Sequence, residues 1–321
     1  MRSRLDYKFV EGYSLDRQQI ESIENDSQNT LVIAGAGTGK TTTIIGKIKW
    51  ILNNWLKNKS KTLPRILVIS FTHATRVELE KRVLAEVLEN DEIFKIYHPS
   101  DFLRVETFHS LALKIMKSAR QNKRARPEKI RLSEVSFEDF LKQARFNIPE
   151  EEAEVYDRLY YLMRNYHIEY QDLKQTNNTE YSWFWQKDLW LKNLKQIQKM
   201  EELGREYKKE MASRGEVDFA GFLEKAIKGL ISIKNEARPE WFKIFCFNFV
   251  IIDEYQDISP LEYALIRNLR EKQNFKLFCV GDDWQTIYQF AGSEIDLILG
   301  FKKYWGETKV FKIEQTYRFP E

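Results

Sequence analysis

A glycine-rich turn between a short apolar run and a helical pattern constrains this chain most strongly. The apolar run, residues 31–34, predicts a buried strand, and apolar residues at helical spacing from Thr43 to Leu56 predict the following helix. In this context a Gly-Lys-Thr ending is typical of a phosphate-binding loop, because glycines let backbone N–H groups close on a polyphosphate at the helix N-terminus. We expect Lys40 to reach the β- and γ-phosphates and Thr41 to hold Mg²⁺. A flexible glycine turn with a chance lysine is the alternative, which the context disfavours. The expected nucleotide-binding residues are Ala34, Gly35, Ala36, Gly37, Thr38, Gly39, Lys40, Thr41 and Thr42.

The composition predicts a protein with a packed core and about two domains, since it has 321 residues of which 43% are hydrophobic. A net charge of +3 gives no overall argument for nucleic acid, so local clusters of basic residues must carry that argument. Cys246 and Cys279 lie in apolar runs, which predicts small core residues and neither a disulfide nor a metal pair. The N-terminus lacks a signal-like apolar region and no run reaches membrane-spanning length, so we expect a cytoplasmic protein without membrane contact.

Strand-like and helical segments alternate through much of the chain, which predicts a parallel sheet covered on both faces. Between residues 111 and 214 the strand-like runs give way to helical spacing with dense lysine and arginine. We therefore expect one α/β domain, formed by residues 1–110 and 215–321, with an all-helical insertion at 111–214. Ligands of such sheets bind at the carboxyl ends of the strands. The other expected elements are a helix over 14–23 with Ser14 as a candidate cap, and strands at 65–71, 103–106, 245–252, 276–280 and 309–313.

Two adjacent carboxylates, Asp253 and Glu254, end the apolar run 250–252. This arrangement suits metal-assisted nucleotide hydrolysis, with Asp253 holding Mg²⁺ through its water shell and Glu254 polarising the attacking water. An acidic surface turn is the alternative. Beside a phosphate loop we favour catalysis, because phosphoryl transfer needs mainly positioning and charge neutralisation.

A third polar segment follows the strand expected at 276–280. Gln285 could sense the γ-phosphate, since its amide both donates and accepts hydrogen bonds. Tyr288 and Phe290 could offer a stacking platform for unpaired bases. A loop glutamine and core aromatic residues are the alternative for this segment taken alone.

Taken together, these motifs resemble the UvrD/Rep-like branch of the superfamily 1 helicases, and their details are most similar to the helicase IV type. The matching blocks follow the family's order and span nearly the whole chain apart from the insertion. They are Leu15-Asp16-Arg17-Gln18-Gln19, Ala34 to Thr41, Phe71-Thr72-His73-Ala74, Thr107-Phe108-His109-Ser110, Glu216-Val217-Asp218-Phe219, Asp253-Glu254-Tyr255-Gln256-Asp257, Gly281 to Tyr288 and Gln315-Thr316-Tyr317-Arg318.

The resemblance implies a RecA-like P-loop NTPase motor domain that uses ATP and Mg²⁺ to move 3′ to 5′ on single-stranded DNA, with a duplex junction as part of its substrate. It also implies that Gln19 and Tyr317 hold adenine and that Arg318 reaches the γ-phosphate. The residues that it places against the strand are Phe71, Thr72, His73, Thr107, His109, Tyr288 and Phe290.

Some residues depart from the family pattern. Thr42 stands where many relatives carry an arginine that covers adenine, and Thr316 replaces a common asparagine. Phe290 and Ala291 replace the usual tryptophan and arginine, which preserves a stacking face but removes a charge.

The sequence stops at Glu321, before the family's second motor domain. Movement along a strand needs two domains that close and open around ATP. We therefore expect this chain alone to bind ATP weakly, hydrolyse it slowly and leave duplex DNA unopened. An engineered truncation and one half of a split motor both fit this expectation.

The first part of the expected insertion, residues 111–131, is strongly basic, with Glu128 as its single acidic residue. Lys123, Arg124 and Arg126 are the candidates for contact with a phosphate backbone, and a solvated helix face is the alternative. Further along, the aromatic cluster of Trp183, Phe184, Trp185 and Trp190 favours helical core.

Two other functions stay open. The chain could be a nucleotide-gated regulatory subunit of a larger assembly, using ATP only as a switch. It could also be a relative directed to RNA or to RNA polymerase.

Overall fold

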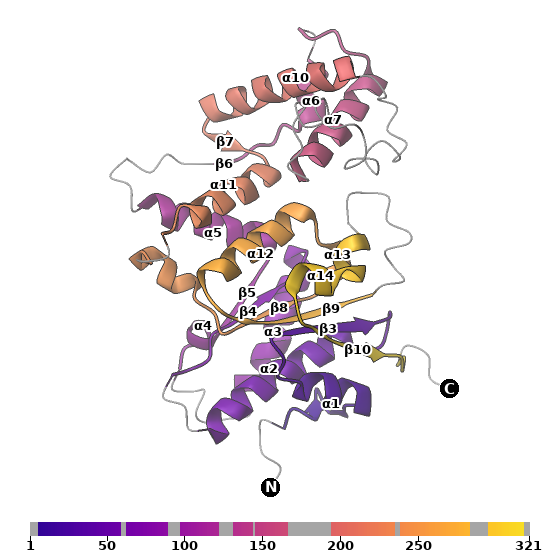
Figure 1. The fold of residues 1–321 in the computed structure, drawn as a ribbon, viewed down its shortest axis with the longest axis vertical. Coiled ribbons are helices and arrows are strands. Elements are labelled where there is room, and N and C mark those ends of the chain that lie inside the picture. The colour runs from indigo at the N-terminus through magenta and orange to yellow at the C-terminus, as the bar shows by residue number, and fades with distance from the viewer. Residues whose placement is uncertain are drawn as a thin grey trace.

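A six-stranded parallel sheet forms the centre of the protein, in the order β10-β3-β9-β8-β4-β5 (Figure 1). The computed structural model describes residues 6–58, 62–88, 97–121, 131–143, 145–165, 194–234, 238–282 and 295–317. Because all six strands run in one direction, their carboxyl ends share one edge of the sheet. The strands are β3 (Asn29–Ala34), β4 (Ile66–Ile69), β5 (Leu103–Glu106), β8 (Phe249–Ile252), β9 (Lys276–Gly281) and β10 (Lys309–Ile313).

Helices cover both faces of the sheet, as the alternation of strands and helices predicts (Figure 1). Successive side chains of a strand point to opposite faces, so Leu67 and Val68 of β4 enter different core clusters. The first face carries α1 (Arg17–Glu24), α2 (Lys40–Lys57) and α3 (His73–Leu88). The second face carries α5 (Phe108–Gln121), α11 (Phe219–Ile231), α12 (Pro260–Lys272), α13 (Ile295–Leu299) and α14 (Phe301–Trp305).

A separate helical unit extends from the second face of the sheet (Figure 1). Its aromatic core includes Phe137, Tyr156 and Tyr207. The unit contains α6 (Phe137–Leu141), α7 (Glu150–Asn165) and α10 (Leu194–Ser213), and a short parallel pair, β6 (Arg131–Leu132) with β7 (Glu216–Val217), joins it to the sheet.

The packing of α5 differs from the insertion expected at 111–214. Leu111 and Ile115 are fully buried in the same cluster as the sheet and α11. A helix that buries its apolar side against the sheet belongs with the sheet, so the helical unit starts after α5.

A buried ion-pair cluster connects the helical unit to α11, which packs on the second face of the sheet. Arg164 of α7 donates from Nε to Oε1 of Glu224 at 2.7 Å and from Nη1 to Asp218. Asp218 in turn caps α11 by accepting from the Gly221 N–H at 2.8 Å. Opposite charges without solvent hold each other in place, because separating either one would leave the other unpaired in the interior.

Some local predictions shift by a few residues. The first helix is capped by Asp16 and not by Ser14, because Asp16 and Gln19 exchange hydrogen bonds in a capping box. Ser14 lies instead in a two-residue hairpin, β1 (Phe9–Val10) with β2 (Tyr13–Ser14). The strand expected at 245–252 starts only at Phe249, since Glu240–Phe245 forms a 3-10 helix, η2, whose buried aromatic residues pack under the sheet.

The predictions about the two cysteines and about membrane-spanning segments can be compared with the structure. Cys279 is a buried core residue, as predicted, whereas Cys246 is only half-buried, and both are free thiols. Within the parts of the chain that the structure describes, no helix is both long and apolar enough to cross a lipid bilayer.

The remaining short helix, α4 (Pro99–Phe102), begins with a cap from His98.

Candidate nucleotide and nucleic-acid site

The glycine loop lies between the end of β3 and the start of α2, at the carboxyl edge of the sheet. Gly37 and Gly39 have φ angles of 79° and 82°, a left-handed backbone that glycine adopts without strain. A Cβ at Gly39 would lie 2.7 Å from Nε2 of Gln19, so this position also lacks room for a side chain. The loop therefore presents backbone N–H groups and the N-terminus of α2 to one space, as phosphate binding requires.

The loop lysine meets one of the two predicted carboxylates. Nζ of Lys40 lies 2.7 Å from Oε2 of Glu254, although the residues are 214 positions apart. Glu254 has a left-handed backbone, with φ 48° and ψ 47°. Such a conformation costs a residue with a side chain about 1 kcal/mol or more, and it is found most often at functional sites.

Asp253 is buried directly beside this ion pair, with 8% of its surface exposed. Its Oδ1 accepts a hydrogen bond from the Glu254 N–H at 3.0 Å. Burial, followed by the charge of Glu254, raises the pKa of Asp253 to about 6.

This environment fits a divalent cation, because a cation would offset the burial and the Glu254 charge that disfavour the ionised Asp253 carboxylate. Thr41, the second predicted ligand, is the second residue of α2 and is half-buried. Among the described residues no group of three or more His, Cys, Asp or Glu side chains gathers as a metal cage. Mg²⁺ commonly takes only one or two protein ligands and completes its shell with water and phosphate oxygens.

The predicted adenine-binding residues lie around the same loop. Gln19 is 2% exposed and its Nε2 donates to the Thr38 carbonyl at 3.1 Å. The N–H of Tyr317 donates to the Gly37 carbonyl at 2.9 Å, and its hydroxyl donates to Asp16 at 2.8 Å. Folding thus brings the segment after β10 against the glycine loop and leaves the Tyr317 ring half exposed.

The first predicted strand-binding segment starts α3. Thr72 and His73 are exposed at the N-terminal end of this helix. The Thr72 hydroxyl accepts from the Thr75 N–H at 3.1 Å and so caps the helix. Phe71 is half-buried, and its ring packs edge-on against Phe108 at 5.4 Å, so it has both a core contact and a solvent-facing side.

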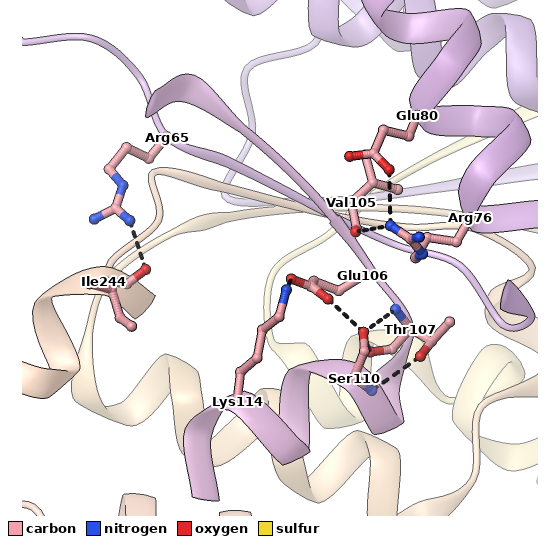
Figure 2. A network of polar contacts seen from close by, with 9 residues as sticks. All are labelled: Arg65, Arg76, Glu80, Val105, Glu106, Thr107, Ser110, Lys114 and Ile244. Carbon is pink, nitrogen blue, oxygen red and sulfur yellow. Dashed lines mark hydrogen bonds and ion pairs between the residues drawn. The ribbon is translucent and has the colours of Figure 1, made fainter. Parts of the chain in front are cut away.

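The second predicted segment caps α5, and Figure 2 shows the network around it. The Thr107 N–H donates to Oγ of Ser110 at 2.9 Å, while the Ser110 N–H donates to Oγ1 of Thr107 at 3.1 Å. Oγ of Ser110 also donates to Glu106 at 2.6 Å, and the same buried carboxylate pairs with Lys114. Glu106 therefore neutralises part of the basic segment that the sequence shows, which the sequence pattern did not indicate.

Phe219 is a candidate that the sequence analysis gave no role. Its side chain is 55% exposed and its ring lies 4.8 Å from that of His109, edge to face. Burial lowers the pKa of His109, which favours a neutral imidazole. An exposed phenylalanine beside a neutral imidazole offers a flat apolar surface to unpaired bases.

Several predicted residues lie outside the described part of the chain, so the structure does not place them. They are Lys123, Arg124, Arg126, Trp183, Phe184, Trp185, Trp190, Gln285, Tyr288, Phe290 and Arg318.

The parallel sheet, the glycine loop and the two carboxylates at its carboxyl edge define a P-loop nucleotide-binding domain. The family model for the UvrD/REP helicase N-terminal domain matches residues 15–305, and the chain belongs to this family.

Three similar proteins show how much of a whole relative this chain represents. DNA helicase IV of Escherichia coli K12 is 28% identical over 98% of this chain and 46% of its own length. A probable DNA helicase II homolog of Mycoplasma capricolum is 26% identical over 95% of the chain and 39% of its own length. DNA helicase II of E. coli K12 is 24% identical over 95% and 38%. The chain thus spans less than half the length of these curated relatives.

Proposed function

We propose that this chain is the nucleotide-binding part of an ATP- and Mg²⁺-dependent motor that moves 3′ to 5′ along single-stranded DNA and acts at a duplex junction. The contact between Lys40 and Glu254 carries the proposal, because it joins the phosphate loop to a carboxylate that can act as a base. The relatives' names, DNA helicase IV and DNA helicase II, support DNA as the substrate. The polarity comes from the family resemblance.

Each residue near the loop has a role in this proposal. On binding ATP, Lys40 exchanges its carboxylate partner for phosphate oxygens, which frees Glu254 to accept a proton from the attacking water. Thr41 and Asp253 would hold Mg²⁺, which supplies positive charge to the phosphates when bound. Gln19 and Tyr317 would hold adenine. Gln285 would sense the γ-phosphate, and Arg318 would reach it, as the family resemblance implies.

The strand would run over the segments that cap α3 and α5. Thr72 and His73 would contact it from the first segment, and Thr107 and His109 from the second. Phe219 joins them by its position beside His109. Phe71, Tyr288 and Phe290, and the basic residues Lys123, Arg124 and Arg126, complete the proposed nucleic-acid surface.

We further propose that residues 1–110 and 215–321 form the motor domain, with α5 added to it by its packing, and that the rest of 111–214 forms the insertion.

Two substitutions test the site and separate a motor from a nucleotide-gated switch. Lys40→Ala is expected to weaken binding of a fluorescent ATP analogue by about tenfold or more, since it removes the cation facing the phosphates. Glu254→Gln should retain binding and lose hydrolysis; a motor then stops, whereas a regulatory switch keeps its ATP-bound function. Unchanged analogue binding by Lys40→Ala would refute the site. A comparison of ATP hydrolysis stimulated by single-stranded DNA and by single-stranded RNA decides between the two substrates.

A further inference from the structure

Gln256 makes a buried bridge between the proposed base and the neighbouring strand. It lies in η3 (Tyr255–Asp257), the short 3-10 turn directly after Glu254, and only 2% of its surface is exposed. Its Nε2 donates to Oε2 of Glu254 at 2.8 Å. At the other end of the amide, Oε1 accepts the backbone N–H of Asp282 at 2.9 Å, where the chain leaves β9.

The orientation of this amide follows from its partners. A backbone N–H can only donate, so Oε1 must face Asp282 and the NH₂ group must face Glu254. Glutamine is the residue type suited to this position, because its side chain carries a donor and an acceptor on one planar group. Asparagine is shorter by one methylene, and glutamate would place a second carboxylate against Glu254.

A glycine at the end of β9, Gly281, leaves room for the side chain of Gln256. A Cβ at Gly281 would lie 2.9 Å from Oε1 of Gln256 and 3.2 Å from its backbone nitrogen. Glycine at this position therefore permits the approach of the amide to the Asp282 N–H. The close approach of Gly281 to the Gln256 side chain is thus a second observation, separate from the two hydrogen bonds of that side chain.

The carboxylate oxygen that Gln256 contacts is also the one that Lys40 contacts, at 2.7 Å. Oε2 of Glu254 thus receives one partner from the phosphate loop and one that is tied to β9. Lys40 is proposed to leave this oxygen when ATP binds, whereas the Gln256 contact does not involve the phosphate loop. Gln256 is then the group that keeps the carboxylate in place.

We propose that Gln256 is a positioning residue for ATP hydrolysis, which fixes the position of the Glu254 carboxylate relative to the end of β9. This inference rests on the proposed function. It predicts that loss of the bridge slows the chemical step and leaves nucleotide affinity nearly unchanged, because misplacing a base affects the transition state more than ground-state binding.

The test uses two substitutions of Gln256 in the full chain. Gln256→Met keeps the length of the side chain and removes both hydrogen bonds, whereas Gln256→Glu keeps an acceptor for Asp282 and removes the donor to Glu254. Gln273→Met is the matched control, because Gln273 is also buried and bridges two backbone groups, the Phe247 N–H and the Phe245 carbonyl, away from the site. Thermal melting first verifies that each variant folds.

We expect kcat to fall by between about tenfold and about a hundredfold in both Gln256 variants, with Kd for the Mg²⁺ complex of an ATP analogue changed by less than about threefold. Hydrogen exchange at the Asp282 amide should speed up in Gln256→Met and stay slow in Gln256→Glu. Gly281→Ala, which pushes on the same amide from β9, should lower kcat in the same direction.

Three results would overturn the inference: a kcat no lower than that of Gln273→Met, a Kd that rises in parallel with the loss of kcat, or unchanged exchange at Asp282 in Gln256→Met. Failure of the proposed function would look different, since wild-type turnover would then equal that of Lys40→Ala. In that case the rate of hydrogen exchange at the Asp282 amide still shows whether Gln256 accepts the hydrogen bond of that amide.

Discussion

Replacing Asp253 with asparagine should stabilise the metal-free protein while removing Mg²⁺-dependent nucleotide binding. Burial raises the pKa of this carboxyl from 3.8 to about 6. The unfolded chain therefore releases the proton at lower pH than the folded protein does, so stability falls as the pH rises through this interval. At about 1.4 kcal/mol for each tenfold change in proton affinity, the difference in the pKa of Asp253 lowers the stability by about 3 kcal/mol at pH 7 and about 1.5 kcal/mol at pH 5. An uncharged asparagine avoids this cost, and its Oδ1 can still accept from the Glu254 N–H.

The assay is urea unfolding without Mg²⁺ at several pH values, extrapolated to water. Asp253→Asn should exceed the wild type by up to about 3 kcal/mol at pH 7, and this advantage should shrink towards pH 5. Asp101→Asn is the control, since Asp101 is an exposed capping residue of α4 where the change should stay within about 0.5 kcal/mol. An Asp253→Asn protein that is no more stable at pH 7, or whose advantage does not depend on pH, would refute the reasoning.

Three further predictions follow from buried or exposed contacts. Arg164→Met should lower the free energy of unfolding by about 3 kcal/mol because it leaves the buried Asp218 carboxylate without its cation and leaves the half-buried Glu224 to its longer ion pair with Lys208. The exposed Arg158→Met on the same helix should change it by less than about 1 kcal/mol, and similar losses in the two variants would count against the buried cluster. Phe219→Ala should weaken binding of a labelled single-stranded oligonucleotide by about 1–3 kcal/mol, as measured by fluorescence anisotropy, and an unchanged Kd would remove Phe219 from the strand-binding surface. Glu106→Gln should release Lys114 for phosphate contact and steepen the salt dependence of DNA binding by about one in log–log slope, a result that a salt titration with an unaltered slope would contradict.

The local chemistry of the site could be predicted because it depends on residues that are neighbours in the chain. Strand, glycine loop and helix follow one another within residues 29–57, so their pattern predicts both the backbone shape at Gly37 and Gly39 and the position of Lys40. The position of the two adjacent carboxylates at the end of β8 could be predicted for the same reason. The alternation of strands and helices likewise predicts a parallel sheet, because consecutive parallel strands need a crossover between them.

Tertiary structure alone decided which distant groups meet. The contact of Lys40 with Glu254 depends on the strand order, in which β9 lies between β3 and β8 although it follows both in the chain. The pairing of Phe219 with His109 and the neutralisation of Lys114 by Glu106 depend on how α5 packs, and residue pattern does not encode that packing. The raised pKa of Asp253 likewise exists only after folding, because desolvation requires the whole sheet and its covering helices. Hydrogen bonding and helical spacing act within a few residues, whereas burial and charge pairing act through space, and only the folded chain defines those distances.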